Sequence, residues 1–146
     1  MRTASFDELT PSDTLYEIPF GYQGLRWWNW IATHQKFYRG AGYINGTVSS
    51  EYMAYNSSGQ PAHAWREGDK PFDFLGCHVN VAWPRGEEEP VITKAWRGNK
   101  LVHTDTLRLD TAGSIYFQAG YRGITKLEFA HGNYERIVVD DCHFRF

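Results

Sequence analysis

Short runs of aromatic and β-branched residues, separated by Gly, Pro, Asn and Ser, recur along the whole chain. Runs of this kind, bounded by turn residues, are typical of β-strands. No segment has the pattern of a helix, and Pro71-Phe72-Asp73 is expected to add at most a single turn. The runs predict an all-β domain, a two-sheet antiparallel jelly-roll sandwich. The predicted strands cover residues 4–6, 25–31, 47–55, 62–65, 74–83, 91–96, 101–109, 115–118, 125–129 and 137–146.

The clearest predicted unit is a hairpin in which the runs 91–96 and 101–109 flank Arg97-Gly98-Asn99-Lys100. Gly98-Asn99 at its tip can take the positive φ angles of a tight turn. The chain has 146 residues, of which 42% are hydrophobic, and this is the usual size of one domain. Residues 1–146 are therefore expected to form a single β-sandwich domain. A domain of this length buries enough surface to fold without a disulfide framework.

The charge and hydropathy patterns argue against two classes of partner. Fifteen basic and seventeen acidic residues are interspersed, with a formal net charge of −2, so no basic stripe can neutralise the phosphates of nucleic acid. No apolar run approaches the roughly 20 residues that a membrane helix needs. We therefore expect neither nucleic acid nor a membrane as partner.

The compartment is less constrained. The segment Met1-Arg2-Thr3-Ala4-Ser5 lacks the apolar character of a signal peptide. Sequons at Asn45 and Asn56 weigh slightly towards secretion. We expect a mature extracellular form, with a cytoplasmic protein as the alternative.

Cys77 and Cys142 are the two cysteines, and each lies within an apolar, strand-like run. Two are too few for a disulfide scaffold. The favoured interpretation is two buried free thiols. One disulfide joining two strands is the alternative, and it would indicate an oxidising compartment.

Several segments together resemble a family of small secreted β-sandwich domains, found in fungal extracellular proteins and in bacterial proteins with a PEP-CTERM sorting tail. The resemblance implies secretion and an architecture similar to carbohydrate-binding modules. At the positions of Trp28 and Trp65, members of that family have small or polar residues. The matching segments are Phe6-Asp7-Glu8-Leu9, Pro71-Phe72-Asp73-Phe74, Tyr121-Arg122-Gly123-Ile124 and Val139-Asp140-Asp141, with 21–27, 42–49, 55–56, 59–62 and 82–83.

Alternation along the run 25–31 separates its tryptophans. Leu25, Trp27, Asn29 and Ile31 are predicted to point one way, and Arg26, Trp28 and Trp30 the other. Trp27 shares an apolar face, so it is expected in the core. Trp28 is then expected on solvent, in a groove or in a dimer contact.

A sugar-binding groove needs flat aromatic rings for the C–H faces of the sugar and polar neighbours for its hydroxyls. The residues expected to supply such a set are Trp28, Trp65, Trp96, Arg26, Asn80 and Arg97. The alternative for each Trp is core or inter-sheet packing, since aromatic side chains dominate cores.

The acidic residues near both chain ends suggest a metal. Jelly-roll modules of this general type often hold a structural calcium ion where the first and last strands meet. Calcium takes six to eight oxygen ligands from carboxylates, carbonyls and water. Asp7 and Glu8, with Asp140 and Asp141, are the candidate ligands. Surface carboxylates paired with Arg136, Arg145 or water are the alternative.

Three functions remain open. The leading one is a non-catalytic binding module for a carbohydrate or similar polar ligand. The second is a small isomerase- or cyclase-type enzyme acting on a hydrophobic metabolite in a pocket between the sheets. The third is an interaction domain that forms a homodimer through its exposed aromatics. The six His make no HxH or HExxH spacing, and no GxSxG motif occurs, so a catalytic metal or a hydrolase is not expected.

Overall fold

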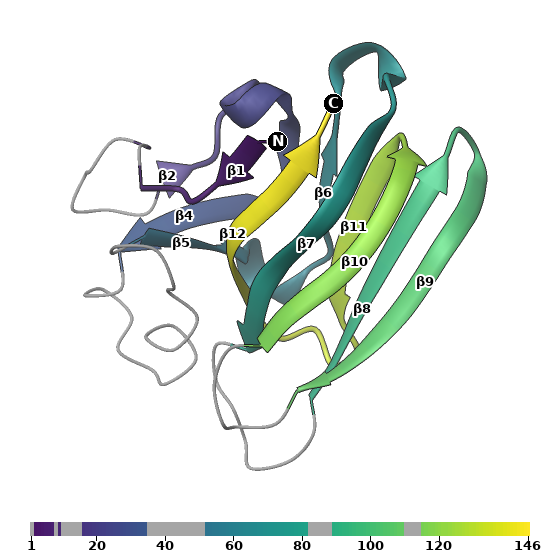
Figure 1. The fold of residues 1–146 in the computed structure, drawn as a ribbon. Coiled ribbons are helices and arrows are strands. Elements are labelled where there is room, and N and C mark those ends of the chain that lie inside the picture. Colours follow the sequence, from purple (N-terminus) through teal and green to yellow (C-terminus); the bar gives the residue numbers. More distant parts are fainter. Residues whose placement is uncertain (1, 8, 10–15, 35–51, 82–88, 110–114) are drawn as a thin grey trace.

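The structure is a computed structural model that describes residues 2–7, 9, 16–34, 52–81, 89–109 and 115–146. Two antiparallel sheets face each other in it (Figure 1). The first sheet has seven strands, β1 (Arg2–Ala4), β2 (Tyr16–Glu17), β4 (Trp30–His34), β5 (Tyr52–Asn56), β7 (Phe72–Val81), β10 (Ile115–Ile124) and β12 (Ile137–Arg145). The second has five, β3 (Arg26–Trp28), β6 (Ala62–Trp65), β8 (Glu89–Arg97), β9 (Lys100–Leu109) and β11 (Lys126–His131).

The strand order shows how the chain winds. In the seven-stranded sheet the order is β10-β7-β12-β5-β4-β2, and β1 pairs with the C-terminal half of β12. In the five-stranded sheet it is β3-β6-β11-β8-β9. The chain changes sheet at most of its connections, including β3 to β4, β5 to β6 to β7, and β9 to β10 to β11 to β12. This winding confirms the predicted all-β, two-sheet antiparallel jelly-roll sandwich.

Aromatic rings fill the space between the sheets. The Phe74 ring on β7 lies with its centroid 5.5 Å from that of Phe144 on β12 and 5.9 Å from that of Phe129 in the opposite sheet. Trp27 and Trp30 meet edge to face at 6.4 Å, a favourable arrangement of ring quadrupoles. The space left among these rings is about 10 Å³, at the lower limit of what one water molecule occupies. This part of the interior is therefore a packed core.

Asn29 is the residue at which the chain passes from β3 in one sheet to β4 in the other. Its φ of 64° is left-handed, and this interrupts the extended backbone. Trp27 and Trp30 consequently both face the core, at 4% and 3% exposure, and the prediction that Trp30 points away from it is wrong. Alternation of faces holds only within one continuous strand. The Asn29 amide donates to the backbone carbonyls of Ser57, Gln60 and Pro61, at 3.1, 3.2 and 3.1 Å.

The predicted hairpin forms from β8 and β9, and Gly98 at its tip has a φ of 61°. Asn99 does not share the positive φ. Pro71-Phe72-Asp73 adds no turn, because Phe72 is already the first residue of β7. A single 3₁₀ turn lies just before it, at Glu67–Asp69, where Gly68 supplies a φ of 73°. The predicted strand segments 47–51 and 82–83 lie outside the described residues.

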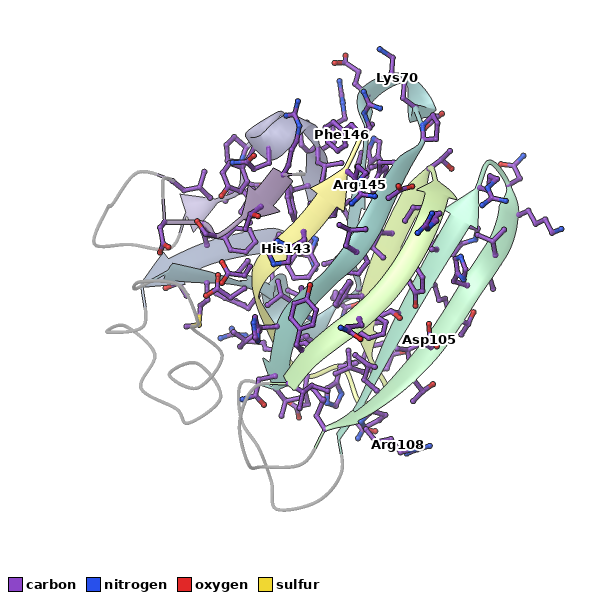
Figure 2. All side chains as sticks on the ribbon, in the orientation of Figure 1. Lys70, Asp105, Arg108, His143, Arg145 and Phe146 are labelled. Atoms are coloured by element: carbon purple, nitrogen blue, oxygen red, sulfur yellow. The ribbon has the colours of Figure 1, made fainter. Side chains whose placement is uncertain are left out.

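The two chain ends of the sandwich lie together, because β1 pairs with β12 (Figure 1). Figure 2 labels Phe146 near Arg145. The guanidinium carbons of Arg2 and Arg66 each lie 4.4 Å from the centroid of the Phe146 ring. Arg66 belongs to the β6–β7 connection, so these contacts attach that connection to the end of β12.

The two cysteines are free thiols, Cys77 on β7 and Cys142 on β12, and both are buried. Asn56 is also buried. Its amide nitrogen donates to the carbonyls of Gln60 (3.0 Å) and Glu135 (3.2 Å). In the folded protein this side chain is therefore not accessible for a glycan, so its sequon lends no support to secretion. The other sequon, at Asn45, lies outside the described residues.

Candidate functional site

The outer face of the five-stranded sheet carries two rows of side chains across its strands. In the first row, Arg26, Trp65, Lys126 and Trp96 stand opposite one another on successive strands. In the second row, Trp28, His63, Glu128 and Lys94 do the same. Neighbouring strands lie about 4.8 Å apart, so adjacent members of a row are within contact range. Aromatic and charged side chains thus alternate across this face.

A hollow of about 460 Å³ opens on this face, where the β6–β7 connection and the β8–β9 hairpin lie at the same end of the sandwich (Figure 1). Trp28 and Trp65 supply its aromatic surface. The remaining lining is mostly polar, from His63, Asp69, Gly98, Asn99, Thr125 and Lys126. Aromatic faces beside hydrogen-bonding groups suit a ligand that has both C–H faces and hydroxyls.

Trp28 is the most exposed of the predicted ligand-binding tryptophans. It is 56% exposed, whereas its neighbour Trp27 is 4% exposed, as alternation within β3 predicts. Trp65 and Trp96 are half-buried. The Trp65 ring also contacts Phe20, with the two centroids 6.0 Å apart and the planes at 61°. Phe20, itself 56% exposed, therefore extends the aromatic surface beyond the hollow.

Charges of opposite sign balance on this face. His63 Nε2 lies 2.8 Å from Glu128 Oε1, with both side chains mostly buried. Arg26 donates from Nη2 to Glu67 Oε1 at 3.0 Å. The Lys126 ammonium lies 5.0 Å from the centroid of the Trp96 ring, a cation–π contact. Among the described residues no carboxylate pairs with Lys126. Asp69 lines the same hollow as Lys126, so the hollow carries both an acidic and a basic side chain.

Arg97 holds the rim of the hollow in place. Its Nε and Nη2 donate to the backbone carbonyls of Gly123 (2.9 Å) and Arg122 (2.8 Å). The Gly98 amide donates to Thr125 Oγ1 at 2.9 Å. These bonds fix the β10–β11 turn against the β8–β9 hairpin, so the side chains at the mouth of the hollow are positioned before any ligand arrives.

The structure brings together most of the residues predicted for ligand binding. Trp28, Trp65, Trp96 and Arg26 share the outer face, and Arg97 lies at its rim with its guanidinium engaged in backbone contacts. Asn80 does not belong to this face. It is buried in β7 of the other sheet, where its Oδ1 accepts a hydrogen bond from the Val81 amide at 2.8 Å.

Sequence reasoning missed His63, Asp69, Lys126 and Phe20. The alternation in Ala62–Trp65, where small buried residues alternate with larger ones, is a signal that puts His63 beside Trp65 on the outer face. Lys126 reaches the hollow only because β11 pairs between β6 and β8, and no local pattern reports that pairing.

The first and last strands, β1 and β12, pair as expected, with Ala4 opposite Cys142 and with Asp140 and Asp141 just before Cys142 in β12. Asp140 is buried in β12 and its Oδ1 accepts a hydrogen bond from the Asp141 amide at 2.8 Å. Within the described residues no group of three or more His, Cys, Asp or Glu is arranged to hold a metal ion. Glu8 lies outside those residues, so calcium binding with Asp7 and Glu8 stays a prediction.

Comparison of the chain with protein-family models and with curated proteins found no match. The resemblance to small secreted β-sandwich domains therefore stays a prediction. In the part of the chain that the structure describes, no helix has the length and apolar character to span a membrane.

Proposed function

We propose that this domain is a non-catalytic binding module for a carbohydrate or a similar polar ligand, and that the ligand occupies the hollow between Trp28 and Trp65. The observation that carries the proposal is the exposure of Trp28, 56%, beside a second indole and a polar lining. An indole ring left on solvent next to hydrogen-bonding groups is typical of a surface that has a partner.

The balance of charges supports an uncharged ligand such as a neutral sugar. The C–H face of a sugar ring would lie on an indole, and its hydroxyls would reach His63, Asp69, Asn99 or Lys126. Stacking on each ring contributes about 1–3 kcal/mol, by analogy with bases on aromatic side chains. Secretion and action outside the cell are part of the same proposal, on the strength of the family resemblance alone.

The enzyme alternative, with a metabolite between the sheets, receives less support. The interior around Trp27, Trp30 and Phe74 leaves about 10 Å³, whereas small-molecule sites measure roughly 300–1,000 Å³. The outer hollow, at about 460 Å³, falls within that range. The observations thus favour the face of the sheet over its interior.

The test compares Trp28→Ala and Trp65→Ala with the wild type, on a glycan array and then by calorimetric titration of the glycans retained. Each variant is expected to bind about tenfold more weakly or worse. The Trp28→Ala protein should keep its thermal midpoint, because the ring packs little. Tyr134→Ala is the matched control, since it removes an aromatic ring that is 67% exposed and lines a different hollow.

Three outcomes would count against the proposal. If the wild-type protein binds no glycan, the proposed function is wrong. If both variants unfold readily, with the free energy of unfolding lowered by about 3–5 kcal/mol, the two rings act as core residues. A wild-type dimer that Trp28→Ala converts to a monomer would favour the homodimer alternative, which size-exclusion chromatography measures.

A further inference from the structure

Phe20 lies outside the hollow and contacts its wall. It is 56% exposed, and its ring meets that of Trp65 at a centroid distance of 6.0 Å. Isolated exposed aromatics need no explanation, but this one continues a surface that already holds Trp28 and Trp65. The aromatic surface therefore runs past the edge strand β3 to the segment before it.

A second hollow lies on the far side of Phe20. It measures about 240 Å³ and is lined by Phe20, Gly21, Gly24, Leu25, Arg26 and Glu67. Arg26 stands opposite Trp65 in the strand register, so the second hollow borders the first. Phe20 of the second hollow contacts Trp65 of the first, and two adjacent hollows of this kind match a ligand made of repeated units.

Arg26 is held in place at the boundary between the two hollows. Its guanidinium donates to Glu67 Oε1 at 3.0 Å, and its central carbon lies 5.3 Å from the centroid of the Phe20 ring. A guanidinium has five N–H donors, and one of them is used by the Glu67 carboxylate. The other N–H groups have no hydrogen-bond partner among the described residues, so they are free to donate to a ligand unit that crosses the boundary.

The planes of Phe20 and Trp65 differ by 61°. A flat crystalline surface can lie on several aromatic rings at once only if those rings are coplanar. These two rings cannot support such a surface. A single chain whose successive units rotate relative to one another can place one unit on each ring.

We infer that the ligand is one soluble, extended oligosaccharide chain that occupies both hollows, with Phe20 and Arg26 forming a second subsite beside the Trp28–Trp65 hollow. This inference rests on the proposed function and narrows its ligand class. It excludes single sugar units and crystalline polysaccharide surfaces as the preferred ligand.

The experiment uses an array of neutral oligosaccharides with one to six units, in the β-1,4-glucose, β-1,4-xylose, β-1,4-mannose and β-1,3-glucose series, followed by titration of the retained series. Affinity should rise with the number of units by about tenfold and then level off when both hollows are filled. In Phe20→Ala and Arg26→Gln this gain in affinity with chain length should shrink. Trp28→Ala should weaken every member of the series.

Thermal melts accompany each variant, and Tyr134→Ala again controls for the loss of an exposed ring. If affinity does not depend on chain length, or if Phe20→Ala and Arg26→Gln behave as wild type, the second subsite is refuted while the proposed function stands. Preferential retention on microcrystalline cellulose or chitin over soluble chains also refutes it. Absence of binding to every series refutes both the proposed function and this inference.

Discussion

The hydroxyl of Tyr121 lies 2.7 Å from Oγ1 of Thr93, so a hydrogen bond joins β10 in one sheet to β8 in the other. The same hydroxyl donates to the carboxylate of Asp105 on the edge strand β9, which Figure 2 labels. Because the phenol has a single proton, Thr93 is the donor in the other bond. The imidazole of His103 stacks on the Tyr121 ring, with the centroids 4.4 Å apart. A polar network thus links the two sheets at the margin of the core.

Replacement of Tyr121 by Phe tests this link. The change removes the hydroxyl and leaves the buried Thr93 without that partner. The free energy of unfolding should fall by about 1–3 kcal/mol, the cost of an unsatisfied buried polar group. Urea denaturation measures it, with Tyr134→Phe as the control because Tyr134 is exposed. An unchanged unfolding free energy in Tyr121→Phe would contradict the prediction.

The same residue predicts a loss of stability in alkali. Burial and the hydrogen bond to Asp105 raise the pKa of Tyr121 well above its usual value. Above about pH 10 the unfolded chain loses this proton while the folded protein keeps it, so the free energy of unfolding falls as the pH rises. Urea midpoints measured from neutral pH to about pH 11 should decline more steeply in wild type than in Tyr121→Phe. If the urea midpoints of the two proteins fall with pH at the same rate, the raised pKa of Tyr121 is not the cause of the loss of stability.

Gly59 and Gly68 form a matched pair for measuring backbone contact. Both have left-handed φ angles, +70° and +73°. A Cβ on Gly59 would lie 1.9 Å from the carbonyl oxygen of Tyr134, whereas a Cβ on Gly68 would meet nothing within 4 Å. Gly68→Ala should lower the free energy of unfolding by about 1–2 kcal/mol, because alanine is strained at a left-handed φ. Gly59→Ala should cost about 3 kcal/mol or more, because the backbone of Tyr134 must move. Equal losses in thermal or urea unfolding would show that the turn relaxes freely.

The thiol of Cys142 should react slowly with alkylating agents. Burial, reinforced by a hydrogen bond with Cys77, raises the pKa of this thiol well above its ordinary value. The reactive thiolate is therefore scarce in the native protein near pH 8. Mass spectrometry after iodoacetamide treatment should find little adduct in buffer and two adducts in concentrated urea. An intact mass about 2 Da lower, with no adducts in urea, would instead identify a disulfide.

Calcium gives a further testable outcome. If Asp7, Glu8, Asp140 and Asp141 contribute to a site between the chain ends, binding to the native state alone adds RT ln(1 + [L]/Kd) to the free energy of unfolding. Millimolar calcium should then raise the thermal midpoint, and a chelator should lower it. Asp141→Asn should reduce the rise. If the thermal midpoint changes with neither calcium nor the chelator, the prediction of a calcium site is wrong.

The sequence predicted the fold better than the site, and Asn29 shows one reason. Composition and turn residues are local signals, so the strand runs and the β8–β9 hairpin could be located from them. The change of sheet at Asn29 depends on a left-handed φ and on contacts with distant carbonyls, which a pattern of alternation does not contain. Trp28, just before this residue, was placed correctly, whereas Trp30, just after it, was not.

The candidate site shows the second reason. Asn80 and Trp96 both fit the residue types of a sugar-binding groove, but only the pairing of strands decides which sheet each belongs to. Lys126 enters the hollow through that pairing as well. Phe20 lies in a connection before β3, and its contact with Trp65 depends on how that connection folds back. Tertiary pairing of this kind has no signature in one sequence.

The position of β12 governs when the sandwich can form. This strand is the last of the domain in chain order, yet it lies between β7 and β5 inside the seven-stranded sheet. Until residues 137–145 have left the ribosome, the pairs β10–β7 and β5–β4 have no strand to connect them, and β1 has no partner. We therefore expect the seven-stranded sheet to be completed only once β12 is available, and a chain cut before β12 to leave that sheet divided between the pairs β10–β7 and β5–β4.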